Sequence, residues 1–173
     1  AYNNYGIIAK SLNKFDLAIT AFSSAIELIE KNRENIDNYA YIMGNLGSCY
    51  YKLGKYDKAY ECLLIDSKGS IKQSQKSSYI FAELNLAEIE SLRKEDQKAI
   101  KRLNNLINNY DEHLTPPLKL TTLKSLINIY KTLGNESKYK YHSDQWIELN
   151  EVYFQNQIKT HKNLIEQQTT DAL

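Results

Sequence analysis

The sequence has few cysteines and no excess of charge of one sign. Its 173 residues include two cysteines, Cys49 and Cys62, which are too few for a fold held together by disulfides and lack the paired spacing of a zinc site. Lys and Arg number 22 against 21 for Asp and Glu, so no strong electrostatic field directs the chain toward nucleic acid or an anionic membrane. Neither kind of partner is expected to contact this chain.

Long apolar runs are also missing. The longest uncharged stretch, Asn38 to Tyr51, is interrupted by polar residues and is shorter than the roughly 20 residues that span a bilayer. Hydrophobic residues make up 42% of the chain and charged residues 25%, a balance typical of one globular unit with a real core.

The side chains that could carry chemistry are scattered. No histidine follows a ligand spacing such as His-Glu-x-x-His, and all three are predicted to be solvated surface residues: His113, His142 and His161. A solvated helix face is likewise predicted for Lys98, Lys101 and Arg102. Gly54-Lys55 lacks both the glycine spacing and the following Ser or Thr of a phosphate loop. We therefore predict no enzymatic activity, no catalytic residues, no metal and no cofactor.

A repeated unit is the strongest signal in the sequence. Four anchor pairs step along the chain by 41, 40 and 40 residues: Tyr5-Gly6, Leu46-Gly47, Leu86-Ala87 and Leu126-Ile127. After three of these anchors a helix pattern stops at Asn13, Gly54 or Gly134 and a new one begins. Gly and Asn are the residues that best tolerate a left-handed helix end, so each unit is predicted to be a helical hairpin.

A second periodic feature concerns side-chain size. Twelve residues beyond the second residue of each of the first three anchors lies an alanine, and four residues later a large apolar side chain: Ala18 and Phe22, Ala59 and Leu63, Ala99 and Leu103. The small residue lets two helices approach closely, and the large one fills the groove between them. We expect the three alanines to be buried where paired helices cross.

This order of Leu-Gly, Gly-x-Tyr, Ala and Phe or Leu resembles the tetratricopeptide repeat, in its first two units most closely. The family normally repeats every 34 residues, so a 40-residue step resembles its long-repeat variant. The resemblance implies an all-α, right-handed α-solenoid of four hairpins with a long projecting C-terminal helix. The expected division is a repeat domain at 1–150, with repeats at about 1–34, 35–73, 74–115 and 116–150, and a helical extension at 151–173.

The hydrophobic periodicity and the turn residues set the expected helix boundaries. Helices are predicted at about 1–12, 15–31, 35–53, 56–67, 74–93, 96–109, 116–133 and 136–168. Pro116-Pro117 after Thr115 is typical of a helix start. Polar loops are predicted at 31–35, 67–73 and 110–115.

The resemblance also implies a binding groove, because in such a stack the first helix of each hairpin lines the concave surface. The predicted peptide-binding residues are Asn4, Lys10, Tyr41, Asn45, Tyr51, Lys52, Phe81, Asn85, Lys124, Ser125 and Lys131. The lysines would make the groove mildly positive and able to accept carboxylates.

Two features of this groove have alternative interpretations. Asn4, Asn45 and Asn85 recur at one repeat position, where an amide can pair with both backbone groups of an extended peptide; the alternative is that asparagine is simply frequent and tolerated on an exposed helix face. Tyr41 and Phe81 either expose aromatic faces to a peptide or pack beneath the extra turn of the longer repeat.

The function we expect is therefore binding of a protein or peptide. The resemblance suggests the partner-sensing part of a larger bacterial regulatory protein, which would be periplasmic if that protein is a membrane-anchored sensor and cytoplasmic otherwise. Two alternatives are a peptide-pheromone receptor domain of a cytoplasmic regulator and a homodimerisation module.

Overall fold

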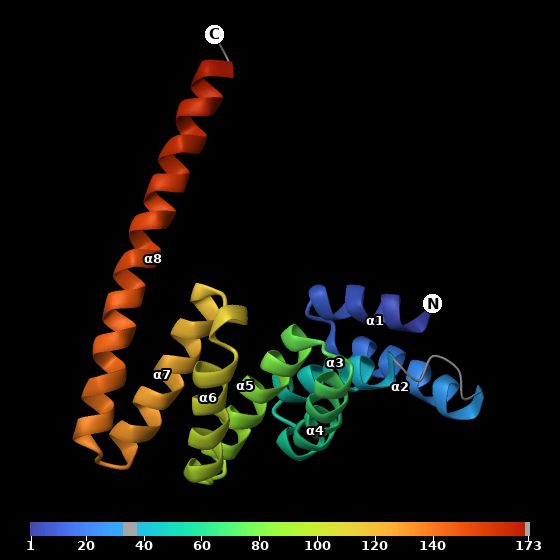
Figure 1. Cartoon of the computed structure of the whole chain (residues 1–173). Helices are drawn as coiled ribbons and strands as arrows, with labels where there is room; N and C mark the ends of the chain where they lie inside the picture. Colours follow the sequence, from blue (N-terminus) through green and yellow to red (C-terminus); the bar gives the residue numbers. More distant parts are fainter. Residues whose placement is uncertain (33–37, 172–173) are drawn as a thin grey trace. The chain divides into compact units, whose positions relative to one another are not determined.

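The computed structural model describes residues 1–32 and 38–171 and shows an all-α chain (Figure 1). No strand occurs in those residues, so the predicted fold class is confirmed. The helices are α1 (Tyr2–Ser11), α2 (Phe15–Asn32), α3 (Tyr39–Lys52), α4 (Tyr56–Lys72), α5 (Lys76–Leu92), α6 (Asp96–Asn109), the short 3-10 helix η2 (Asp111–His113), α7 (Pro116–Thr132) and α8 (Glu136–Asp171).

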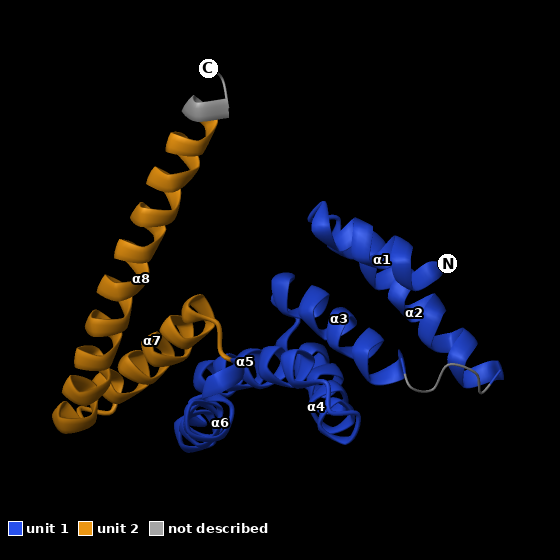
Figure 2. Cartoon of the chain, turned by 45° about the horizontal axis from the view of Figure 1, so that its top comes forward, with its two compact units in different colours: residues 1–113 blue, residues 114–173 orange. Residues whose placement is uncertain are grey.

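The chain divides into two compact units (Figure 2). Unit 1, residues 1–113, holds three antiparallel hairpins made by α1 with α2, α3 with α4, and α5 with α6. Unit 2, residues 114–173, holds the fourth hairpin, α7 with α8. The boundary predicted after residue 150 falls inside α8, which is continuous from Glu136 to Asp171.

Five helices end in the same kind of turn. The second residue after each helix has a positive φ: Asn13 (57°), Gly54 (71°), Ser74 (55°), Lys94 (61°) and Gly134 (66°). The next backbone N–H then donates back to a carbonyl five residues earlier, for example Lys55 N to Tyr50 O at 2.9 Å. This closure satisfies carbonyls that the helix end leaves open, and it confirms the left-handed caps predicted at Asn13, Gly54 and Gly134.

The predicted pattern of an alanine followed four residues later by a large apolar side chain forms part of the core of each hairpin in unit 1. Ala18, Ala59 and Ala99 are fully buried. A Cβ placed on Gly6 would lie 2.6 Å from the ring of Phe22, and one placed on Gly47 would lie 2.9 Å from Leu63 Cγ. In the first two hairpins the large residue of the second helix therefore packs directly on the backbone of the first helix.

One loop prediction was wrong. Residues 67–73 were expected to link two hairpins, but α4 continues through Lys72. Two of their polar side chains are part of a buried helix face: Ser67 Oγ donates to Glu83 at 2.6 Å, and Ser70 Oγ donates to Asp66 at 2.7 Å. The predicted loop at 31–35 and the start of the third helix at 35 lie partly outside the described residues.

Candidate functional site

The first helices of the three hairpins in unit 1 lie side by side in the order α1, α3, α5 (Figure 2). Eight of the eleven predicted groove residues belong to these helices. The other three, Lys124, Ser125 and Lys131, lie on α7 of unit 2, where both lysines are exposed and Ser125 is half-buried. The geometry of the candidate site is therefore that of α1, α3 and α5.

Two aromatic side chains are exposed at equivalent positions of neighbouring helices. Tyr41 near the start of α3 is 39% exposed, and Phe81 on α5, 40 residues later, is 45% exposed. Of the two interpretations of these residues, the structure agrees with exposure. Aromatic side chains have a large apolar area and few rotatable bonds, so exposed pairs of them suit the anchoring of a partner's side chains.

Asn45 differs from the solvent-facing amide that was expected. It is only 8% exposed, and its Oδ1 accepts a hydrogen bond from Lys10 Nζ at 2.7 Å, which joins α3 to α1. Burial lowers the pKa of Lys10, an effect that nearby Cys49 opposes. Within the described residues, Nδ2 of Asn45 is buried without a hydrogen-bond partner. Asn45 can offer a peptide both of its polar groups only if Lys10 moves away.

The other two asparagines are also not equivalent. Asn4 on α1 is exposed. Asn85 is half-buried, and its Nδ2 donates to the Phe81 carbonyl of its own helix at 2.7 Å. That bond occupies the amide nitrogen and leaves Oδ1 as the polar group that can still accept a hydrogen bond. The three asparagines recur at the predicted repeat position, but their environments differ. Asn4 is exposed, Asn45 is bonded to Lys10, and Asn85 is bonded to its own helix.

Tyr51 connects α3 to α5. It is half-buried, and its pKa is raised by burial first and then by its hydrogen bond to Glu88 of α5. The Tyr51 ring lies 5.7 Å from the ring of Tyr56, and the exposed Lys52 places its Nζ 5.8 Å from the Tyr51 ring centroid. Polar contacts therefore tie α1 to α3 and α3 to α5, while Tyr41, Phe81 and Lys52 are exposed.

Residues 1–63 match a tetratricopeptide repeat family model, and residues 81–113 match a second tetratricopeptide repeat model. Together the matches take in more than half of the chain. The chain belongs to the tetratricopeptide repeat family. This repeat is a non-catalytic fold that generally mediates protein–protein interaction.

A solved structure with the same kind of fold is that of BtubC (BKLC) from P. vanneervenii, with a TM-score of 0.75 and 18% sequence identity. The match covers 88% of this tetratricopeptide repeat chain and 63% of the BtubC chain, so this chain spans less than two thirds of that structure. At this identity the likeness concerns the fold alone. No curated protein matches the chain.

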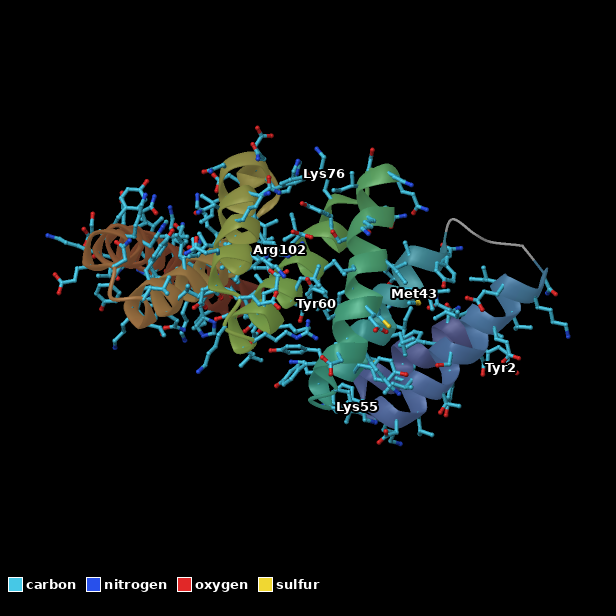
Figure 3. The ribbon with its side chains drawn as sticks, turned by 90° about the horizontal axis from the view of Figure 1, so that it is seen from below. Tyr2, Met43, Lys55, Tyr60, Lys76 and Arg102 are labelled. Atoms are coloured by element: carbon cyan, nitrogen blue, oxygen red, sulfur yellow. The ribbon has the colours of Figure 1, made fainter. Side chains whose placement is uncertain are left out.

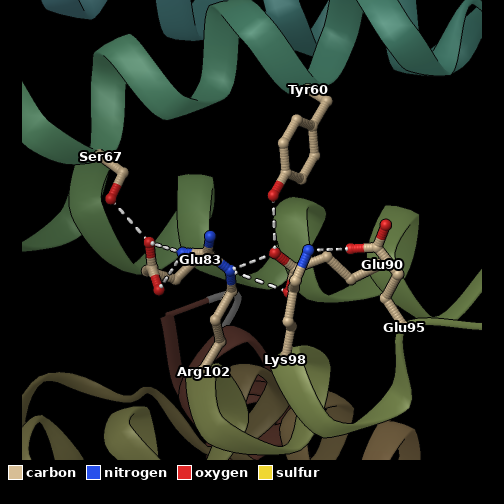
Figure 4. Close-up of polar contacts among 7 residues, drawn as sticks. All are labelled: Tyr60, Ser67, Glu83, Glu90, Glu95, Lys98 and Arg102. Atoms are coloured by element: carbon tan, nitrogen blue, oxygen red, sulfur yellow. Dashed lines mark hydrogen bonds and ion pairs between the residues drawn. The ribbon is translucent and has the colours of Figure 1, made fainter. Parts of the chain in front are cut away.

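The third tetratricopeptide repeat contains a buried ion network that the sequence analysis missed. Figure 3 marks Tyr60 on α4 and Arg102 on α6, and Figure 4 enlarges their contacts. Arg102 Nη1 donates to both oxygens of Glu83 at 2.8 and 2.9 Å, and its Nε donates to both oxygens of Glu90 at 2.9 Å. Tyr60 Oη donates to Glu90 at 2.9 Å.

This network corrects the prediction that Arg102 belongs to a solvated helix face. Its side chain is 21% exposed, while those of Glu83 and Glu90 are 5% and 0% exposed. Burial opposes the charge of Arg102, but the two carboxylates raise its pKa. A cavity of about 380 Å³ lies beside these residues, between α4 and α6. One signal in the sequence could have revealed the network: Glu90 stands where other repeats have an aromatic residue, Tyr50 or Tyr130.

The remaining reactive side chains form no site. Cys49 and Cys62 are buried thiols, and burial raises the pKa of Cys62 to about 11. His142 was expected to be solvated, which is wrong: it is 5% exposed and stacks on Tyr130 at 5.5 Å. Across residues 1–32 and 38–171, no three His, Cys, Asp or Glu side chains are placed to hold a metal ion. None of the helices described is both long and apolar enough to cross a membrane.

Proposed function

We propose that the face formed by α1, α3 and α5 binds an extended peptide segment of a partner protein. The observation that carries this proposal is the pair Tyr41 and Phe81, exposed at the same repeat position of adjacent helices. A peptide in contact with both would remove large apolar areas from water, and aromatic anchors of this kind often dominate binding energy.

Polar groups beside the pair would orient the peptide. Oδ1 of Asn85 is available to accept a backbone N–H, and it lies on the helix that carries Phe81. Lys52 is exposed at the other end of α3 and can attract a carboxylate. The peptide expected from these groups is extended, with apolar side chains for the two rings and an acidic residue toward Lys52.

The test begins with peptides selected from a displayed random library on the intact chain. Their affinity is then measured by calorimetric titration against the wild type and the Tyr41→Ala/Phe81→Ala variant. Loss of two aromatic anchors should weaken binding by about 2–3 kcal/mol, or 30- to 150-fold. The control is Ile65→Ala, a residue 38% exposed on the second helix of the same hairpin as Tyr41.

The control variant should bind like the wild type, and thermal melts should show all three proteins folded. Normal binding by the double variant would overturn the proposal, as would an equal loss in the Ile65 variant. Sensing within a larger bacterial regulator and reception of a peptide pheromone rest on the resemblance and stay predictions.

A further inference from the structure

Helix α8 is far longer than the helix with which it forms a hairpin. It has 36 residues against 17 for α7, so at 1.5 Å per residue α7 can flank only about half of its length. Between residues 151 and 168 every side chain except Tyr153 is exposed. A helix in such a state gains little from packing, and packing is the main source of helix stability in proteins.

Large apolar side chains are spaced along this helix in a pattern typical of a coiled coil. Ile147, Phe154, Ile158 and Ile165 are separated by seven, four and seven residues and are 58%, 59%, 48% and 50% exposed. The a and d positions of a heptad have this spacing and fall on one helix face. Ile158 and Ile165 also line a shallow hollow on the surface of α8, together with His161.

Two polar residues occupy the remaining positions of the stripe, Glu151 and His161. They distinguish the two ways in which the stripe could pair with a copy of itself. A parallel pair in register would place Glu151 against the partner's Glu151, which repels. An antiparallel pair centred on Asn156 would place Glu151 against the partner's His161.

The same antiparallel register also matches the apolar residues. It sets Phe154 against the partner's Ile158 and Ile147 against the partner's Ile165, so that each large side chain of the stripe meets another. On one flank it brings Glu148 near the partner's Lys162. Lys162 already lies 3.9 Å from Glu166, but both side chains are well exposed, and so weak an ion pair can be shared.

From this complementarity we infer that α8 binds α8 of a second copy of the chain in an antiparallel coiled coil centred on Asn156. The heptad spacing fits a partner helix with the same period. In the antiparallel register the charges are also complementary, because each acidic side chain meets a basic one of the other copy: Glu151 with His161, and Glu148 with Lys162. This self-association goes beyond peptide binding by unit 1 and does not depend on it.

The first test is sedimentation equilibrium of the intact chain, which should give the mass of a dimer. The Phe154→Asp/Ile158→Asp variant should give the mass of a monomer, because a dimer would have to bury charged aspartates at the centre of the helix interface. The matched control is Val152→Asp, a residue 55% exposed on another face of the same helix, which should remain a dimer. Circular dichroism should show that all three proteins stay helical.

Charge variants test the orientation. His161→Glu should weaken the dimer at least tenfold, because it sets one glutamate against another. Glu151→His/His161→Glu should restore the dimer, because the glutamate and the histidine then only exchange places. Cysteine variants test the register. When Phe154→Cys and Ile158→Cys are mixed and oxidised, disulfides should form between the two variants and rarely between two copies of the same variant. The native thiols of Cys49 and Cys62 are 0% and 7% exposed and should not react. A monomeric wild type, an equal effect of Val152→Asp, or disulfides mainly between identical cysteine variants would overturn the inference. Peptide binding at Tyr41 and Phe81 is measured separately, so failure of either proposal leaves the other standing.

Discussion

The carboxylate of Asp66 on α4 lies directly against the Cα of Gly44 on α3. A Cβ added to Gly44 would be 2.6 Å from Cγ of Asp66 and even closer to its Oδ2. Asp66 is 1% exposed and is held by the hydroxyls of Ser70 and Ser78 at 2.7 and 2.9 Å. The close approach of α3 and α4 therefore requires glycine at this position.

Gly44→Ala should destabilise the fold by about 1–3 kcal/mol through overpacking. The sign is informative, because Gly to Ala inside a helix is otherwise favourable by about 1 kcal/mol. Urea unfolding of unit 1, followed by circular dichroism, gives the change. In an Asp66→Ser background the same substitution should cost less, and an equal cost in both backgrounds would show that Asp66 is not the obstacle.

Lys94, the second residue after α5, has a φ of 61°, and two other repeats have Gly54 and Gly134 at this position. A side chain in this left-handed conformation is strained, whereas glycine is not. Lys94→Gly should therefore stabilise the protein by about 0.5–1 kcal/mol, measured as a rise in the urea midpoint. Lys68→Gly, an exposed position within α4, should lose about 1 kcal/mol. Destabilisation by both variants would contradict the assignment of strain to Lys94.

Local patterns were sufficient to predict the hairpins. Turn residues such as Gly54 and pairs such as Ala59 and Leu63 act within one repeat, so their consequences can be worked out from neighbouring sequence. The helix boundaries followed closely wherever these signals were present. The exception is α4, for which polarity alone had indicated a loop. It continues through Ser67 and Ser70 because Glu83 and Asp66 accept hydrogen bonds from their hydroxyl groups.

The candidate site was predicted less completely, because its details depend on contacts between repeats. Asn45 is buried and accepts a hydrogen bond from Lys10, which lies 35 residues earlier. Arg102 is half-buried because two carboxylates from α5 meet it there. The exposure of Tyr41 and Phe81 does not depend on such contacts. Their position within the repeat could therefore indicate it.

Arg102→Met should strongly destabilise unit 1, by about 3 kcal/mol, because it leaves two buried carboxylates without their cation. Lys98→Met is the control, since Lys98 is 62% exposed and should contribute little. Replacing the whole network with Glu83→Leu/Glu90→Leu/Arg102→Met should recover most of the loss. Chemical denaturation measures all three variants; a triple variant as unstable as Arg102→Met would contradict this explanation.

The stability of unit 2 should depend on the protonation of His142. Burial lowers its pKa below the usual 6.5, an effect that the hydrogen bond from His142 Nδ1 to Gln145 Oε1 opposes and Lys138 reinforces. The unfolded chain therefore binds a proton more readily, so this contribution is present above pH 6.5 and is lost as the pH falls through the lowered pKa.

Fluorescence of Trp146, the single tryptophan of the chain, follows the unfolding of unit 2 at pH values on both sides of 6.5. The wild type should lose stability on the acidic side. His142→Phe, which keeps a ring beside Tyr130, should remove most of this loss, whereas His161→Gln should not. The same acid sensitivity in the His142 variant would contradict the assignment.

Peptide binding by the first-helix face is tested most directly by photocrosslinking at Phe81. Benzoylphenylalanine at position 81 should crosslink to a selected peptide on irradiation, and the same residue at position 65 on α4 should not. Mass spectrometry should place the crosslink on an apolar residue of the peptide, and excess unlabelled peptide should abolish it. A crosslink from position 65 with none from position 81 would contradict the account.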